Sequence, residues 1–300
     1  NFIFIDSFEN HKNKQSRKKN CLNLIISKSG NTLETITNVN ILVKNNQKNI
    51  FITQNKKSYL MDLANKLKAD VVHHNNYIGG RYSVLSEVGM LPAELMGLSS
   101  TKFKRFNYLI KNKNFINSLV SNVTNTIALI KKKKFNSIVL NYDERSNDLF
   151  YWYQQLIAES LGKNGKGILP IVSHMPKDNH SLMQLYLEGN KSNFFTFFFV
   201  EDKLNRKIIN KNILSSHKYL KNKNVSDISE AQFIATQNVF KRKNIPFRSF
   251  YLNQRNEESL GELFTFFILE TILLAQAMNI NPYDQPAVEL VKVETKKILS

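Results

Sequence analysis

The chain has 300 residues, which is enough for two domains that each bury a core of their own. Its hydrophobic share of 42% is ordinary for a soluble globular protein, and a single cysteine, Cys21, excludes an internal disulfide framework. The net charge of +18 would suit a nucleic-acid binder, but lysine is scattered with asparagine through most segments, and stacking aromatics interleaved with arginine are not evident. We therefore expect no nucleic-acid partner, and a basic surface that attracts anionic metabolites.

No apolar run reaches the length of a membrane span. The nearest, residues 263–277, is interrupted by Glu270 and two threonines. Without a secretory leader or a spanning segment, the expected location is cytoplasmic, with no membrane partner. The sequence opens on Asn1 inside a strand-like run at residues 2–5, and we expect the natural N-terminus to lie upstream.

Residues 22–35 read LNLIISKSGNTLET. The apolar run 22–26 has the length and aliphatic content of a buried parallel strand, and apolar residues at helical spacing follow from Leu33. A strand that turns through hydroxyls, a glycine and Lys28 into a helix N-terminus is typical of a phosphate cradle, because free backbone N–H groups face the anion. An ordinary hydroxyl-rich helix cap is the alternative. The turn predicts an anion site without naming the anion.

The next segments continue an alternation of strands and helices. Strands are predicted at 49–53 and 69–73, with a helix at 59–68. This spacing favours a parallel, doubly wound sheet, in which ligands bind at the carboxyl ends of the strands. The run 77–83 then places Arg81 directly after two glycines, either as a ligand-facing arginine or as an exposed arginine in a turn.

A long helical region at 103–133 separates this sheet from a second one. The alternation restarts with strands predicted at 137–142, 167–172, 194–200 and 247–252, and with a helix at 148–161. The lysine- and asparagine-rich stretch 203–224 reads as an exposed excursion, and two helices, 257–278 and 285–299, end the chain. The predicted fold class is α/β, with two tandem doubly wound parallel-sheet domains, 1–105 and 106–300, and a C-terminal helix.

Four side chains of the second half could take part in chemistry. Gln155 and Glu159 are four residues apart and face one side of a helix, His180 lies at a predicted helix start, and Lys292 lies on the last helix. Taken singly, each is more often a solvated surface residue. No Cys or His cluster has the spacing of a metal site.

Five segments, in this order, resemble those of the glucose-6-phosphate isomerase (phosphoglucose isomerase) family in its short bacterial form. They are Ser27-Lys28-Ser29-Gly30-Asn31-Thr32-Leu33-Glu34-Thr35, Gly79-Gly80-Arg81-Tyr82-Ser83, the Gln155 to Lys163 segment, Asp178-Asn179-His180-Ser181, and the closing stretch from Asn281 to Lys292. The resemblance implies sugar-isomerase-type domains and an aldose–ketose isomerase of glycolysis and gluconeogenesis. The expected reaction is the reversible conversion of glucose 6-phosphate into fructose 6-phosphate through a cis-enediol.

The resemblance also implies four catalytic residues. Glu159 would move the proton between C1 and C2, and Arg81 would stabilise the negative charge of the intermediate. His180 and Lys292 would assist opening of the sugar ring. Because the family takes this histidine from the neighbouring subunit, a homodimer is expected.

The remaining site residues implied by the resemblance bind substrate. They are Ser27, Lys28, Ser29, Thr32, Gln155 and Gln285. The chemistry requires neither a metal nor an organic cofactor, so none is expected. Proton transfer at carbon needs a carboxylate, a cation beside the developing oxyanion and an anchor remote from the reacting carbons. Glu159, Arg81 and the phosphate cradle supply these three parts.

The chain departs from the family pattern in two ways. Ala287 and Val291 stand where the closing signature has glycine, which changes backbone freedom near Lys292. A glycine- and serine-containing substrate loop of the family has no counterpart after Asn1. Two alternative functions remain open: a related isomerase that also accepts mannose 6-phosphate, and a non-catalytic sugar-phosphate-binding module.

Overall fold

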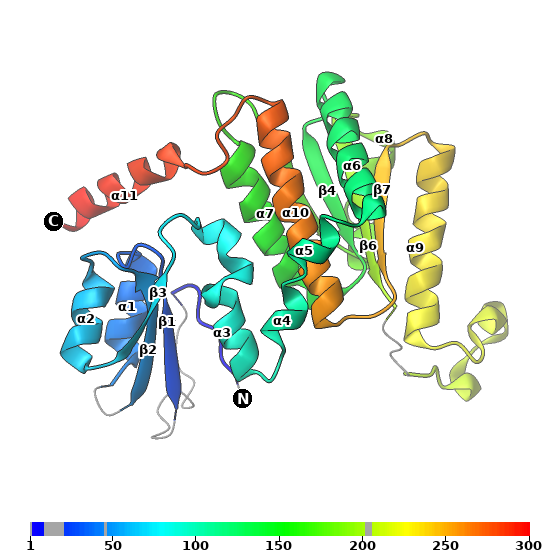
Figure 1. Cartoon of the computed structure of the whole chain (residues 1–300). Helices are drawn as coiled ribbons and strands as arrows, with labels where there is room; N and C mark the ends of the chain where they lie inside the picture. The colour runs from blue at the N-terminus through cyan, green and yellow to red at the C-terminus, as the bar shows by residue number, and fades with distance from the viewer. Residues whose placement is uncertain (1, 9–20, 45–46, 202–205) are drawn as a thin grey trace. The chain divides into compact units, whose positions relative to one another are not determined.

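The computed structural model describes residues 2–8, 21–44, 47–201 and 206–300 (Figure 1). The chain forms two compact units, Asn1–Lys104 and Arg105–Ser300. Each unit contains one parallel sheet with helices packed on it, so the predicted α/β class with two parallel sheets and a C-terminal helix is confirmed.

The first unit contains a three-stranded parallel sheet. Its strands follow each other in the order β1 (Leu22–Ile26), β2 (Lys48–Gln54) and β3 (Asp70–His74). The helices of this unit are α1 (Leu33–Leu42), α2 (Tyr59–Leu67), the 3₁₀ helix η2 (Gly80–Leu85), α3 (Glu87–Leu95) and α4 (Ser100–Phe103). Ile25 and Phe51 lie side by side in the register and form a buried core with Val39 of α1 and Leu60 of α2. Both helices therefore cover the same face of the sheet.

The second unit contains four parallel strands in the order β5-β4-β6-β7. Their bounds are β4 (Asn136–Asn141), β5 (Leu169–His174), β6 (Asn193–Val200) and β7 (Phe247–Leu252). The chain passes from β4 to β5 on one side and then to β6 on the other, which is the reversal of a doubly wound sheet. Every residue of β6 is buried, because it is a central strand covered on both faces.

Helices cover both faces of this second sheet, whereas the last helix, α11 (Pro286–Leu299), buries none of its residues. The other helices of this unit are α5 (Phe106–Leu109), α6 (Lys113–Lys131), α7 (Asn147–Leu161), α8 (Met183–Glu188), α9 (Val225–Arg242) and α10 (Glu257–Ala277). Phe197 of β6 packs against Phe233 and Phe240 of α9 on one face. Phe198, next along the strand, packs against Phe150 of α7 on the opposite face, where α10 and α6 also lie (Figure 1).

The seven strands of the two sheets, β1 to β7, occur where the sequence predicts them, and their ends differ from the prediction by at most two residues. The strand expected at residues 2–5 is wrong. These residues form no regular structure, their apolar side chains are exposed, and no strand in the described part of the chain pairs with them. Helix α9 was not predicted, although its start carries a capping box in which Asn224 and Asp227 bond each other's backbone N–H groups.

Among the described residues, α10 alone is long and apolar enough to cross a membrane by length and composition. It is a core helix of the second unit. Its buried residues include the charged Glu270, which pairs with Arg248 of β7. The helix therefore packs against its own sheet, as its aromatic contacts with β7 also show.

Candidate active site

The turn after β1 does not cap the helix that follows it with a side chain. Thr32 occupies the N-cap position of α1, but its hydroxyl makes no capping hydrogen bond. It lies 2.7 Å from the hydroxyl of Ser27, which is buried at the end of β1. Ser29 is exposed, and its hydroxyl accepts the N–H of Asn31. The first turn of α1 therefore keeps backbone N–H groups that no hydroxyl of Thr32 occupies, and these can serve an anion.

Gly30 fixes the shape of this turn. Its φ of +65° lies in the left-handed region, and a Cβ there would stand 2.2 Å from the Ser58 hydroxyl. The Gly30 carbonyl accepts the N–H of Leu60 over 3.0 Å, and the Asn31 side chain accepts that of Tyr59 over 3.0 Å. The turn therefore accepts hydrogen bonds from two N–H groups at the start of α2, so these two groups are not available to a ligand.

Lys28, in the turn after β1, feels the charges of two other cations. Burial lowers the pKa of Lys28, and the positive charges of Lys56 and Arg81 lower it further. Cations that repel one another at the mouth of a helix N-terminus are stabilised when an anion binds between them. Lys56 was not singled out in the sequence; it lies in the turn after β2, and its proximity to Lys28 comes from the pairing of β1 with β2.

Arg81 lies in η2 and is almost fully buried, with 3% of its surface exposed. Its guanidinium carbon lies 5.3 Å from the centre of the Tyr82 ring. Gln54, at the end of β2, connects this region to the cradle: its N–H donates to the Lys28 carbonyl, and its side chain donates to the carbonyl of Asn76. The first unit therefore brings Ser27, Lys28, Thr32 and Arg81 to one edge of its sheet.

In the second unit, Gln155 and Glu159 face the same side of α7, as their spacing predicts. The Gln155 side-chain amide donates to the Glu159 carboxylate over 2.9 Å. Glu159 is half-buried in the last turn of α7. A carboxylate held by an amide donor is oriented and remains able to accept a proton.

The loop after α7 holds the closing stretch of the chain. The Lys163 ammonium donates to the Asn281 carbonyl, and to the Asp284 carboxylate over 2.7 Å. The hydrogen bond from Lys163 lowers the pKa of Asp284. Gln285, the next residue, is the N-cap of α11 and lines a pocket of about 240 Å³ with Tyr283, Asp284, Pro286 and Glu289.

His180 and Lys292 make their described contacts within their own segments. His180 follows the 3₁₀ helix η4 (Lys177–Asn179), three residues before α8, and its backbone N–H donates to the Lys177 carbonyl. Lys292 forms an exposed ion pair with Glu289, one turn earlier on α11. Their assignment to ring opening stays a prediction.

The turn that carries His180 is organised by Asp178. One carboxylate oxygen accepts the Ser173 hydroxyl over 2.8 Å and the His174 N–H over 2.7 Å, and the other accepts the Ser181 hydroxyl over 2.9 Å. Burial by itself raises the pKa of Asp178, but these hydrogen bonds outweigh it, and the net pKa lies below its usual value.

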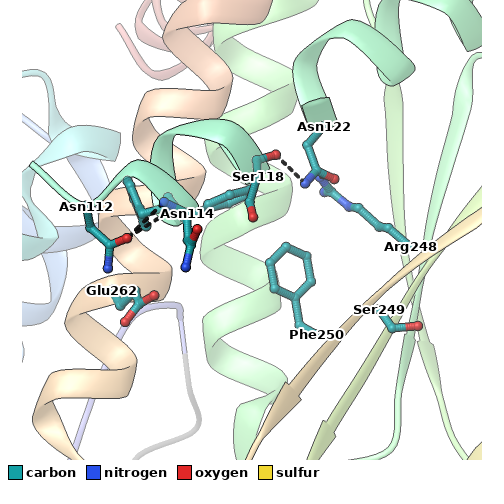
Figure 2. A pocket seen from close by; sticks show the side chains of 10 residues that line it. Asn112, Asn114, Ser118, Asn122, Arg248, Ser249, Phe250 and Glu262 are labelled. Atoms are coloured by element: carbon teal, nitrogen blue, oxygen red, sulfur yellow. Dashed lines mark hydrogen bonds between the residues drawn. The ribbon is translucent and has the colours of Figure 1, made fainter. Parts of the chain in front are cut away.

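Another pocket of the second unit is lined by none of these residues. It measures about 370 Å³ and opens between α6, β7 and α10, where Asn112, Asn122, Arg248, Phe250 and Glu262 face it (Figure 2). The Arg248 guanidinium donates hydrogen bonds to four side chains of its own unit, those of Glu270, Thr196, Tyr153 and Asn122. Its charge is therefore neutralised by Glu270 rather than offered to a ligand. In the part of the chain that the structure describes, no three His, Cys, Asp or Glu side chains gather closely enough to hold a metal ion.

The sequence model of the family described as "Phosphoglucose isomerase" matches residues 6–300. The chain is 32% identical to a glucose-6-phosphate isomerase of Methanocaldococcus jannaschii, and the alignment covers 99% of the chain and 76% of that relative. It is 34% identical to a glucose-6-phosphate isomerase of Mycoplasmopsis pulmonis, over 94% of the chain and 70% of the relative.

Two solved structures share the fold. A hypothetical protein from Thermus thermophilus superposes with a TM-score of 0.82 at 24% identity, over 92% of the chain and 71% of that protein. A glucose-6-phosphate isomerase from Chlamydia trachomatis superposes with a TM-score of 0.71 at 19% identity, over 92% of the chain and 58% of that protein. The chain thus spans from somewhat over half to about three quarters of the length of these four proteins.

Proposed function

Because the chain belongs to the phosphoglucose isomerase family, we propose that it catalyses the reversible isomerisation of glucose 6-phosphate and fructose 6-phosphate. The observation that carries the proposal furthest, beyond family membership, is the turn before α1: its N-cap Thr32 makes no capping hydrogen bond, and its Lys28 lies within electrostatic reach of Lys56 and Arg81. A doubly charged phosphate ester is the kind of anion that such a turn binds.

The two units divide the work. Residues 1–105 supply the anchor: Ser27, Ser29 and Thr32 donate hydroxyls to the phosphate, and Lys28 provides a point charge. Residues 106–300 supply the proton transfer. Anchoring the phosphate fixes the reacting carbons without requiring a strong contact to them, so that binding energy lowers the barrier rather than the ground state.

The proton moves through the Glu159 carboxylate. Glu159 removes the C2 proton of the open-chain aldose, the C2–H electrons form the C1=C2 double bond of the enediol, and the C1 carbonyl oxygen takes up negative charge or a proton. The proton of the O2 hydroxyl passes to O1, the electrons left on O2 form the carbonyl at C2, and the C1=C2 electrons take the proton back from Glu159 at C1, which gives the ketose. Arg81 stabilises the charge on the oxygens, and Gln155 orients Glu159 through the 2.9 Å hydrogen bond.

The assignments of the remaining residues rest on the family resemblance. Gln285 positions the sugar, and His180 and Lys292 move protons to and from the ring and hydroxyl oxygens when the pyranose or furanose opens. With His180 supplied by the neighbouring subunit, the active enzyme is a homodimer. It acts in the cytoplasm, in glycolysis and gluconeogenesis, without a metal or an organic cofactor.

A coupled assay tests the reaction. The full-length protein is given fructose 6-phosphate, and the glucose 6-phosphate formed is oxidised by a dehydrogenase that reports through its nicotinamide cofactor. We expect Glu159→Gln to lower turnover by at least about 100-fold while sugar-phosphate binding persists, since only the general base is removed. Glu294→Gln, on the exposed face of α11, is the matched control. Unchanged turnover in Glu159→Gln would remove Glu159 as the base.

The same assay separates the alternatives. Comparable rates on mannose 6-phosphate would identify the broader isomerase, because the two aldoses differ only at C2. Binding of fructose 6-phosphate, measured by calorimetry, with no turnover in the full-length protein would favour the non-catalytic binding module and reject the proposal.

A further inference from the structure

A buried histidine of the first unit contacts both ends of the segment that carries Arg81. His74 is the last residue of β3, and none of its side chain is exposed. One ring nitrogen, Nε2, lies 3.0 Å from the carbonyl of Ile78, the residue before Gly79. The other, Nδ1, pairs with the carboxylate of Glu87, the first residue of α3. Ile78 and Glu87 flank η2, so one imidazole spans both ends of it.

Both ring nitrogens face acceptors. A backbone carbonyl only accepts, so Nε2 carries a proton. Burial by itself raises the pKa of Glu87, but hydrogen bonds from its own N–H and from the His74 ring, with the charge of that ring, hold the net pKa below its usual value. The ring is thus held from both sides, by the Ile78 carbonyl at Nε2 and by the Glu87 carboxylate at Nδ1.

The segment between these contacts is held by short local bonds. The Ser83 hydroxyl donates to the Gly80 carbonyl over 2.6 Å, the Ser86 hydroxyl donates to the Ser83 carbonyl over 2.7 Å, and the Tyr82 N–H donates to the Gly79 carbonyl. Such bonds fix the internal shape of η2 but not its position on the sheet. The contacts of His74 join the two ends of η2 to the end of β3.

We propose that His74 is a positioning residue for Arg81: the clasp formed by its imidazole ring with the Ile78 carbonyl and the Glu87 carboxylate fixes the segment from which the guanidinium stabilises the enediolate. The inference rests on the proposed role of Arg81 and adds two residues that the resemblance does not single out. His73, the neighbour of His74, is exposed and lies outside the clasp. It provides a matched control of the same residue type.

The test measures kcat and KM for fructose 6-phosphate in three variants, His74→Gln, Glu87→Ala and Glu87→Gln, with His73→Gln as the control. Each variant is assayed at a temperature below its unfolding midpoint. We expect His74→Gln and Glu87→Ala to lower kcat by about 10- to 100-fold, because a misplaced Arg81 loses contact with the transition state. KM should change little, since the cradle at Ser27 to Thr32 is untouched. Glu87→Gln, which keeps an acceptor oxygen for Nδ1, should recover most of the loss.

A kcat in folded His74→Gln equal to that of His73→Gln would overturn the proposal, as would a rise in KM with unchanged kcat. If His74→Gln does not fold, Glu87→Ala decides by the same criteria. If the wild-type protein itself shows no turnover, the proposed function fails, and the clasp is judged by NMR. The Nε–H signal of Arg81 should then shift in His74→Gln and Glu87→Ala but not in His73→Gln, and an unmoved signal rejects the clasp.

Discussion

Lys163 and Asp284 are 121 residues apart in the sequence, yet their charged groups are joined by a hydrogen bond of 2.7 Å. Lys163 lies four residues beyond Glu159, and Asp284 directly precedes Gln285. The pair therefore links the residue proposed as the base to the residue proposed to position the sugar. The Lys163 side chain is only 11% exposed although it leaves a surface loop, because it lies over the closing stretch.

We expect Lys163→Met to affect catalysis more than stability. Asp284 is 55% exposed, so water screens the ion pair and its contribution to the free energy of unfolding should be small. Freed from Lys163, the stretch that carries Gln285 should loosen, which raises KM for fructose 6-phosphate several-fold. Steady-state kinetics and urea unfolding check the two effects. Lys297→Met, which removes an exposed pair with Glu294 on α11, should leave KM unchanged; equal KM in both variants would exclude a positioning role for Lys163.

Gly30→Ala should damage both the fold and the cradle of the first unit. The new Cβ would collide with the Ser58 hydroxyl, and the φ of +65° is itself unfavourable for alanine. We expect a loss of about 2 kcal/mol or more in the free energy of unfolding, together with weaker binding of inorganic phosphate. Thermal unfolding and calorimetric titration measure these quantities. Gly80→Ala is the control for stability, since no atom lies within 4 Å of its added Cβ; equal unfolding midpoints in the two variants would contradict the prediction.

The lowered pKa of Asp178 predicts a pH-dependent contribution to stability. In the folded state its carboxylate accepts from Ser173, His174 and Ser181, so the ionised form is favoured over that in the unfolded chain. Such a group stabilises the fold above its unfolded pKa of about 3.9, and the contribution disappears as the pH falls through the folded value. The difference between the unfolding midpoints of wild type and Asp178→Asn should therefore stay constant above about pH 5 and shrink as the pH falls below about 4. A gap that widens as the pH falls would show that the sign is wrong.

The buried pair of Arg248 and Glu270 should be essential to the second unit. Glu270 is 1% exposed, and one of its carboxylate oxygens has no hydrogen-bond partner among the described residues. Arg248→Met leaves that carboxylate buried without its cation, which should cost about 3–5 kcal/mol of unfolding free energy. Urea denaturation measures the loss. Adding Glu270→Met should recover much of it, since an apolar pair restores a neutral interior; a double variant as unstable as Arg248→Met would argue against charge burial as the cause.

The strands were predictable because each is a short apolar run between turn residues. The turn at Ser27 to Thr32 was identified for the same reason: its hydroxyls, glycine and lysine are contiguous in the sequence. Residues 2–5 are equally apolar, but a strand also requires a neighbour to pair with, and the pairing partner of an apolar run cannot be read from its composition. Helix α9 was missed because its surface is rich in polar residues, which weakens the periodic signal.

The residues of the site that escaped the sequence act through long-range contacts. Lys163 looked like the end of a helix motif, and its partner Asp284 is known only from the folded chain. His74 stands next to a second histidine in the sequence, and in the structure burial distinguishes it from His73. The family resemblance names residues that would touch substrate. Residues that hold them in place vary with the surrounding packing, so their identification requires the structure.

The eight-residue strand β6, Asn193-Phe194-Phe195-Thr196-Phe197-Phe198-Phe199-Val200, bears on how the protein is made. A strand with five phenylalanines, high β-propensity and no internal charge is typical of segments that self-associate while unpaired. Its inner neighbour β4 precedes it in the chain, but its outer neighbour β7 begins only at Phe247, after α9. During synthesis one edge of β6 therefore stays open until some fifty further residues have been added. Lys191 and Glu201 place a charge near each end of the strand, as gatekeepers of aggregation do, and soluble expression should be most sensitive to changes at these two positions.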